Sequence, residues 1–232
     1  MDNGCETIAQ NVRALQREIA SLARDPAHPP LLLPVTKTQS VERIFALKEA
    51  GVRAIGENRV QEILKKYPDI SADFSIHLIG QLQTNKINYI IGKVCMVQSL
   101  DRPRLAQALD AAAQRAGRRL SVLLEVNIGG EAQKAGVRPE EAEAFARQCA
   151  KLPGLSVQGL MTVLPASDDP EALRPLFSRM RALFERLRAQ AIDGVQMAEL
   201  SMGMSGDWRV AAQEGATMLR IGSAIFGERA RP

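Results

Sequence analysis

A lysine directly after the first apolar run has the most distinctive chemistry in this sequence. Residues 31–36 read LLLPVT, and Lys37 follows them. If the run forms a buried strand, the stem of Lys37 lies among apolar side chains, and this desolvation lowers the pKa of its amine. A neutral amine can attack an aldehyde and form a Schiff base. On position alone, a strand-end lysine whose ammonium group extends into solvent is the more common case.

Two turns rich in glycine and serine, near the end of the chain, are typical of a phosphate site. LSMGMSGDW (200–208) and RIGSAIFG (220–227) both place small residues after an apolar run. Glycine lets the backbone approach a ligand closely, and N–H groups at a helix start bind anions. We expect Ser201, Gly222 and Ser223 to donate hydrogen bonds to a phosphate. Two ordinary turns are the alternative interpretation.

Other polar residues near the strand ends have both a structural and a functional interpretation. Arg220 is expected to be the last side chain of its strand, where it forms either an ion pair or a hydrogen bond to a ring nitrogen of a ligand. In the second case, the permanent charge of the guanidinium discourages protonation of that nitrogen. His77, inside FSIHLIG, is expected to support the site rather than to catalyse. Glu57 and Glu125 could form an acid/base pair, but the favoured interpretation is that they anchor polar networks. Trp208 is expected to be a packing residue.

These residues need a framework that brings them together, and the hydrophobic pattern predicts one. Short apolar runs alternate with amphipathic stretches, as in a parallel sheet that is covered on both faces. The runs are LLLPVT (31–36), VRAIG (52–56), FSIHLIG (74–80), KVCMVQS (93–99), LSVLLEVNI (120–128), LSVQGLM (155–161), VQMAELS (195–201) and ATMLRIG (216–222). Helical patterns cover 40–50, 58–66, 84–91, 102–117, 139–150, 170–190 and 207–214, and another amphipathic helix is expected over 5–24.

Eight strand-and-helix units predict an α/β fold, a single (β/α)8 TIM barrel over residues 31–227 with an extra N-terminal helix. Such barrels run to roughly 250 residues, so this one would be compact and would use the whole chain as one domain. Their active sites lie at the C-terminal ends of the strands, where Lys37 and Arg220 would meet. A doubly wound open sheet is the alternative, but no GxGxxG turn follows any apolar run.

The composition argues against several classes of protein. The 232 residues are 46% hydrophobic with a net charge of +4, which fits a globular domain. We expect no membrane segment and no signal peptide, because no run approaches the roughly 20 apolar residues of a membrane span. Separated cysteines and two histidines predict neither disulfides nor a metal centre. Dispersed basic residues argue against a nucleic-acid partner, and the expected location is cytoplasmic.

Seven motifs, taken in order, resemble those of one known family. They are VTKT (35–38), GENRVQE (56–62), HLIGQLQTNK (77–86), EVN (125–127), GLMT (159–162), LSMGMSGDW (200–208) and RIGSAIFG (220–227). This set, which spans most of the chain, resembles the YggS/PROSC family of pyridoxal phosphate homeostasis proteins. That family is in turn similar to the N-terminal barrel domain of bacterial alanine racemase. One departure is PVTK in place of the frequent AVSK, where threonine keeps the hydroxyl group.

The resemblance implies a role for each matching position. Lys37 would carry pyridoxal 5′-phosphate as an internal aldimine, and Asn58 would lie near the cofactor ring and its 3-hydroxyl group. Arg220 would face the pyridine nitrogen, while His77 and Met161 would support the site from the core. The phosphate would be bound by a further set: Ser201, Met202, Gly203, Gly222 and Ser223. No metal ion is implied.

Two functions are compatible with such a site: a carrier that buffers and delivers the cofactor, and an amino-acid racemase. A two-base racemase needs a second proton donor, which the alanine racemases supply as a tyrosine across a dimer from an additional β domain. Here Tyr67 and Tyr89 fall in or next to expected helices, and the barrel leaves no residues for a second domain. An arginine at the ring nitrogen also weakens the electron sink of the cofactor.

We therefore favour the carrier, with apoenzymes that depend on pyridoxal 5′-phosphate (PLP) as acceptors. Its expected oligomeric state is a monomer or a weak homodimer. A third hypothesis is a barrel that binds phosphate esters without a covalent lysine, in which case Lys37 stays idle. Lys86 and Lys134 also follow strand ends, and both have the interpretation of solvated surface residues.

Overall fold

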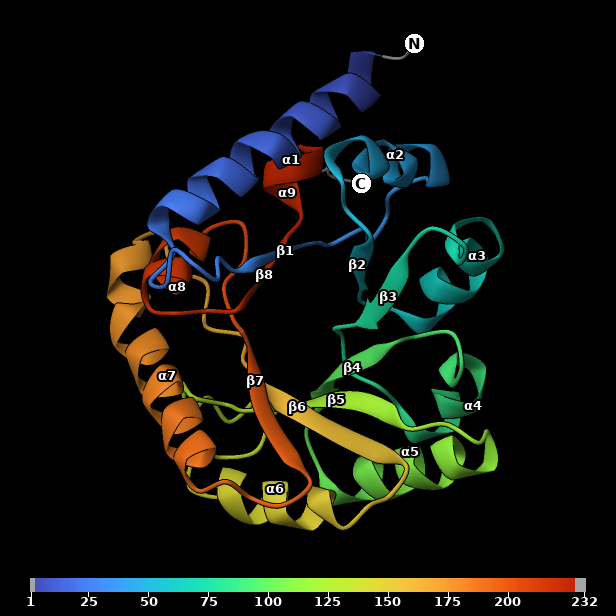
Figure 1. Cartoon of the computed structure of the whole chain (residues 1–232), viewed down its shortest axis with the longest axis vertical. Helices are drawn as coiled ribbons and strands as arrows, with labels where there is room; N and C mark the ends of the chain where they lie inside the picture. The colour runs from blue at the N-terminus through green and yellow to red at the C-terminus, as the bar shows by residue number, and fades with distance from the viewer. Residues whose placement is uncertain (1–2, 228–232) are drawn as a thin grey trace.

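The predicted barrel is present in the computed structural model, which describes residues 3–227. Eight parallel strands form its wall (Figure 1). Their bounds are β1 Leu31–Pro34, β2 Ala54–Glu57, β3 Ser75–Leu78, β4 Met96–Leu100, β5 Leu120–Glu125, β6 Leu155–Met161, β7 Val195–Ser201 and β8 Met218–Ile221. Each strand overlaps one of the eight apolar runs, so the hydrophobic pattern of the sequence identifies every strand of the sheet.

The strands pair in chain order around the ring, and β8 pairs with β1. Beyond the end of β1, a bridge between Val35 and Gly56 joins the first two units, and the Thr36 N–H donates to the Gly56 carbonyl oxygen at 3.0 Å. Since all the strand pairs are parallel, the C-terminal strand ends lie at one rim of the barrel. The junction of β1 and β2 therefore lies at the same rim as Lys37.

Helices surround the strands on the outside of the ring (Figure 1). The α-helices are α1 Asn3–Leu22, α2 Val41–Phe45, α3 Val60–Ile70, α4 Ile87–Ile90, α5 Pro103–Arg115, α6 Ala142–Ala150, α7 Arg174–Ala189, α8 Trp208–Gln213 and α9 Ser223–Phe226. Three short 3₁₀ helices are η1 Ala46–Ala50, η2 Thr84–Lys86 and η3 Pro170–Leu173. None of the described helices is long and apolar enough to cross a membrane.

The structure corrects several expected boundaries. The helices expected over 40–50, 84–91 and 170–190 are each divided into a 3₁₀ and an α part. In the last case a proline in the first turn of α7 explains the division, because proline has no N–H to donate and favours the start of a new helix. Arg220 is not the last residue of its strand, since β8 continues to Ile221. The short α9, after β8, has no counterpart among the expected helices.

Burial explains why the strand sequences are mainly apolar, with Arg220 of β8 as a charged exception. All four residues of β8 are buried, because one face of the strand meets the barrel interior and the other meets the helices. Outside this ring, α1 buries one apolar face, which includes Ile8, Val12 and Ile19. Figure 1 shows α1 lying across α8 and α9, and the Asn11 side chain donates to the Ile225 carbonyl at 3.0 Å. The N-terminal helix thus packs against the last unit of the barrel.

Candidate functional site

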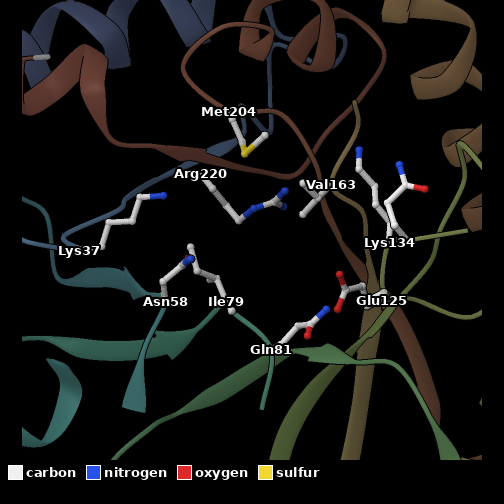
Figure 2. A pocket seen from close by; sticks show the side chains of 12 residues that line it. Lys37, Asn58, Ile79, Gln81, Glu125, Lys134, Val163, Met204 and Arg220 are labelled. Carbon is white, nitrogen blue, oxygen red and sulfur yellow. The ribbon is translucent and has the colours of Figure 1, made fainter. Parts of the chain in front are cut away.

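Two adjoining cavities open at the rim formed by the C-terminal strand ends. The larger has a volume of about 390 Å³ and the smaller about 270 Å³. Residues that line both cavities, and so lie at their junction, are Lys37, Asn58, Ile79, Met204 and Arg220. Figure 2 shows Lys37 and Asn58 on one side and Glu125 on the other, with Arg220 between them. Three residues singled out in the sequence, Lys37, Asn58 and Arg220, are therefore brought together.

Lys37 lies on a tight turn between β1 and α2. The Gln39 N–H donates to the Thr36 carbonyl oxygen at 3.0 Å and closes this turn. Thr38 has a φ of 66°, a left-handed conformation that is disfavoured for a β-branched residue. Lys37 itself is half-buried, and its side chain extends into the space between the two cavities (Figure 2). The turn thus presents a partly desolvated amine to any ligand at the barrel mouth.

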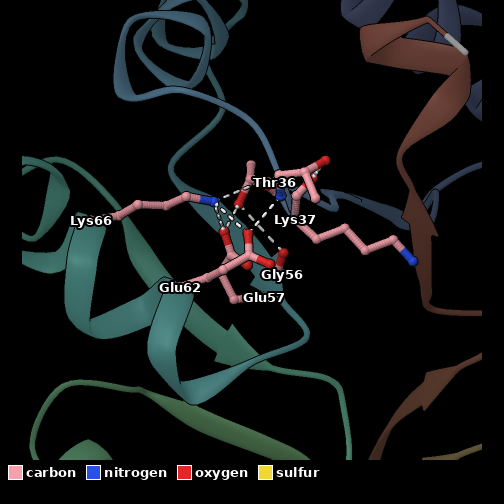
Figure 3. Close-up of polar contacts among 7 residues, drawn as sticks. Thr36, Lys37, Gly56, Glu57, Glu62 and Lys66 are labelled. Atoms are coloured by element: carbon pink, nitrogen blue, oxygen red, sulfur yellow. Dashed lines mark hydrogen bonds and ion pairs between the residues drawn. The ribbon is translucent and has the colours of Figure 1, made fainter. Parts of the chain in front are cut away.

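A buried polar network lies on the other side of this turn (Figure 3). Lys66 of α3 is 6% exposed, and its ammonium group contacts Glu57 Oε1 at 2.6 Å. The Thr36 hydroxyl donates to the same Glu57 oxygen at 2.7 Å. Burial raises the pKa of the Glu57 carboxyl, and Lys66 opposes that rise. Glu57 therefore anchors a polar network, as its strand-end position predicts.

Arg220 is held from beneath by a chain of hydrogen bonds that crosses the barrel. Its Nη1 donates to Ser201 Oγ at 2.6 Å, and its Nη2 donates to the Thr162 carbonyl at 2.7 Å. The Ser201 hydroxyl donates to Gln98 Oε1 at 2.7 Å. The Gln98 amide in turn contacts His77 Nδ1 at 3.0 Å. Burial lowers the pKa of His77 to about 4, so the ring is neutral and its Nδ1 accepts this hydrogen bond.

The first residues of the LSMGMSGDW turn lie below the cavities rather than on their walls. Ser201 is fully buried against Arg220, and the Met202 N–H donates to the Met218 carbonyl at 3.2 Å. Gly203 has a φ of 91°, and a Cβ added to it would lie 2.5 Å from the Ala211 Cβ, so this glycine is required by the backbone and the packing. The residues of this turn that line the smaller cavity are Met204, Ser205 and Gly206.

Backbone donors gather at the end of the smaller cavity away from Glu125. Ser205 Oγ accepts from the Gly222 N–H at 3.1 Å and from the Ala224 N–H at 3.5 Å. Gly222 and Ser223 line this cavity, as does Ser205. Because both amides converge on Ser205 Oγ and donate to it here, a phosphate oxygen would bind them by taking the place of that hydroxyl group. Gly222 and Ser223 thus reach the cavity, and Ser205 joins them.

Glu125 closes the opposite end of the larger cavity. It is 7% exposed, its Oε2 has no hydrogen-bond partner, and burial together with repulsion from Asp101 raises its pKa to about 7. Lys134 lines the same cavity but is paired with Glu131 at 2.5 Å. The expectation that Glu125 anchors a polar network is wrong. The reason is its placement at the end of β5, where it faces the cavity instead of a donor from a neighbouring strand.

Other residues singled out in the sequence lie outside the cavity walls. Met161 is fully buried at the end of β6, and Trp208 is 1% exposed, so both are packing residues. Tyr67 and Tyr89 lie on α3 and α4, and neither lines the two cavities. Lys86 lies in η2, also outside both cavities. Within residues 3–227, no group of three or more His, Cys, Asp or Glu side chains is arranged to hold a metal ion.

Two residues of the site escaped the sequence analysis although each carries a signal. Gln98 is a polar residue inside an apolar run, which is a sign of a buried hydrogen-bonding role. Lys66 lies three residues after Ile63 and four before Ile70, both of which are buried. This spacing places a charged residue on the apolar face of a helix, where it needs a partner.

Comparison with known proteins agrees with this architecture. The family described as "Alanine racemase, N-terminal domain" matches residues 5–230. An alanine racemase of Clostridium difficile shares the fold, with a TM-score of 0.74 and 16% identity over 96% of this chain and 58% of the racemase chain. Fold and rim site together therefore define a barrel of the alanine racemase N-terminal class.

Closer relatives narrow this class. The pyridoxal phosphate homeostasis protein of Aquifex aeolicus is 41% identical over 228 residues, which are 98% of this chain and 99% of the relative. The structure of PipY from Synechococcus elongatus with PLP bound has a TM-score of 0.83 and 31% identity, over 95% of this chain and 100% of PipY. The chain belongs to the family of pyridoxal phosphate homeostasis proteins, which its sequence motifs resemble.

Proposed function

We propose that this chain binds pyridoxal 5′-phosphate between the two cavities and holds it as a Schiff base on Lys37. The observation that carries the proposal is the convergence, on one cavity, of the half-buried Lys37 with the backbone N–H and hydroxyl groups of two turns. Lys37 lines the cavity that ends at Ser205, Gly222 and Ser223. Pyridoxal 5′-phosphate has both an aldehyde and a phosphate, so it matches both ends. The PLP bound to PipY, a relative with the same fold, supports this choice.

Each residue of the site has a role in this proposal. Asn58 and Arg220 line both cavities, so Asn58 would contact the ring near its 3-hydroxyl group and Arg220 would face the ring nitrogen. Burial lowers the pKa of Arg220 to about 10, which still leaves the guanidinium charged at neutral pH. When bound, the cofactor supplies an aldehyde carbon and an electron-withdrawing ring. Ser201 fixes Arg220 through its hydrogen bond, and Met202 and Gly203 lead into the turn whose Ser205 and Gly206 line the phosphate end.

The biological role that we propose is pyridoxal phosphate homeostasis without substantial catalysis. The chain would hold the cofactor reversibly and release it to PLP-dependent apoenzymes. The names of its relatives support this role. We further propose a cytoplasmic location and a monomer or weak homodimer.

A spectrum tests the covalent link. A Schiff base between the cofactor and Lys37 gives an absorbance band at about 420 nm, and borohydride removes the band while fixing cofactor mass on the lysine. We expect Lys37→Ala to lose both the band and the fixed mass. Lys65→Ala, an exposed lysine on α3, serves as the control that keeps both. Retention of the band in Lys37→Ala would show that another lysine reacts, and a wild-type protein that takes up no added cofactor would refute the proposal.

A further inference from the structure

Two side chains of α3 hold the backbone on both sides of Lys37. Before it, Lys66 Nζ donates to the Thr36 carbonyl oxygen at 2.8 Å. After it, the Thr38 N–H donates to Glu62 Oε2 at 2.5 Å. Glu62 and Lys66 are one helical turn apart, and their charged groups are 3.1 Å apart. We refer to Glu62 and Lys66 as the α3 clamp, which grips the residues that flank Lys37 (Figure 3).

The α3 clamp holds a backbone conformation that the sequence alone does not favour. Among the described residues other than glycine, only Thr38 and Ala191 have a positive φ. A β-branched residue persists in this region only where its surroundings over-determine it. Glu62 supplies such a restraint at the Thr38 N–H, and the Thr38 hydroxyl adds a hydrogen bond to the Lys37 carbonyl at 2.6 Å. The direction in which Lys37 leaves the turn therefore depends on this contact.

The α3 clamp is anchored in the barrel wall through Glu57. This residue is fully buried at the end of β2, and its Oε1 contacts Lys66 at 2.6 Å. Its Oε2 has no hydrogen-bond partner, so Lys66 is its main source of charge compensation. A buried carboxylate that loses its counterion is strongly destabilising, which makes Lys66 hard to replace. The network thus fixes the turn relative to the sheet rather than only to the helix.

Lys66 is not arranged to react with an aldehyde itself. Its ammonium group is in contact with three oxygen acceptors, from Thr36, Glu57 and Glu62. It lines neither of the two cavities, and Figure 3 shows its side chain reaching toward Thr36 while that of Lys37 extends away from the network on the other side. The two lysines therefore differ in role, with one presented to the cavity and the other enclosed by the network.

We propose that Glu62 and Lys66 are positioning residues that orient Lys37 for the covalent step. This inference rests on the proposed function, in which Lys37 Nζ adds to the aldehyde carbon, a C=N bond forms, and the aldehyde oxygen leaves as water. The α3 clamp contacts the lysine turn and the buried Glu57 of β2, whereas the phosphate donors belong to the turns after β7 and β8. Its loss should therefore impair formation of the Schiff base and leave the non-covalent seat of the cofactor intact.

Two compounds, pyridoxal 5′-phosphate and pyridoxine 5′-phosphate, distinguish covalent from non-covalent binding. Pyridoxine 5′-phosphate carries an alcohol in place of the aldehyde, so it occupies the seat but cannot react with an amine. We expect Glu62→Ala and Lys66→Met to weaken binding of pyridoxal 5′-phosphate by at least about tenfold, because small misplacements of a reacting group cost large factors. Binding of pyridoxine 5′-phosphate, measured by calorimetry, should change by less than about threefold. Lys65→Met, on the exposed side of α3, is the matched control and should leave both affinities unchanged.

Stability measurements and a rescue variant distinguish a loss of positioning from a loss of folding. Lys66→Met leaves Glu57 without its counterion, so thermal unfolding of each variant is measured without cofactor. Glu62 is 20% exposed and its removal is milder, which makes Glu62→Ala the decisive variant. Adding Thr38→Gly to it should restore part of the pyridoxal 5′-phosphate affinity, because glycine adopts a positive φ without strain.

The outcomes distinguish this inference from the proposed function. The positioning role would be overturned if the variants weakened binding of both compounds equally, or of neither. Borohydride would still fix cofactor mass on Lys37 in that case. Absence of that fixed mass in the wild-type protein would instead overturn the proposed function and, with it, the role of the α3 clamp.

Discussion

At the scale of single residues, the polar side chains of the barrel mouth are of two kinds. Some line the cavities, such as Lys37 and Asn58, and others lie beneath them and fix a lining residue. Ser201 is of the second kind, since it joins Arg220 to Gln98 inside the barrel. This arrangement follows from its position at the end of β7, where an inward side chain meets the filled interior rather than the open rim.

Glu125 yields a prediction on pH dependence. Its pKa is raised from 4.5 to about 7, mainly by burial, so the folded state binds a proton that the unfolded state has released. Its contribution to stability is therefore full below pH 4.5 and is lost as the pH rises through about 7. Glu125→Gln has no such loss. We therefore expect the free energy of unfolding of Glu125→Gln to rise relative to that of the wild type between pH 4 and pH 8. The expected change in this difference is on the order of 3 kcal/mol.

Urea denaturation of both proteins from pH 4 to pH 8 measures this difference. Subtracting the two curves cancels the other titrating groups, including Glu57 and His77. Glu140→Gln, which removes an exposed carboxylate at the surface, is the control for the loss of one negative charge. A flat difference for Glu125→Gln would mean that its carboxyl titrates as an ordinary exposed group.

At the scale of elements, the turn between β7 and α8 offers a matched pair of glycines. An alanine at Gly203 would need a φ of 91° and would approach the Ala211 Cβ to 2.5 Å. An alanine at Gly206 would meet no atom within 4 Å and has no positive φ to adopt. We expect Gly203→Ala to lower the free energy of unfolding by about 2–4 kcal/mol, from backbone strain and overpacking. Gly206→Ala should stay near the wild type in the same urea titration, and equal stabilities would contradict the packing argument.

The elements also show where sequence reasoning succeeds and where it ends. Each strand was predictable because a strand buried on both faces is mainly apolar, as in the consecutive buried residues Val122, Leu123 and Leu124 of β5. Lys37, Asn58, Gly222 and Ser223 reach the cavity as strand-end positions predict. Lys66 left a signal as a charge on the apolar face of α3, but the contact of the α3 clamp with the lysine turn did not, because it depends on how far a helix side chain reaches toward a loop from another unit. Such a contact leaves no period in the sequence.

At the scale of the whole molecule, one barrel supplies the entire candidate site. The match covers 58% of the alanine racemase chain that shares its fold, so the likeness extends over only part of that racemase. Within residues 3–227 the cavity walls include no tyrosine, and both tyrosines lie on the outer helices α3 and α4. A racemase of the two-base kind would therefore need another group to exchange protons with a bound amino acid.

Glu125 is the residue best suited to exchange protons with a bound amino acid, which makes the racemase alternative testable. It lines the larger cavity with a pKa of about 7, near that of an effective acid/base group. Against this, a charged Arg220 facing the ring nitrogen, as in the binding mode that we propose, would oppose carbanion formation. We therefore expect no exchange of the α-proton of alanine, or of other amino acids, in D2O above the level with Lys37→Ala, as followed by NMR. Exchange that requires both Lys37 and Glu125 would instead establish an enzyme.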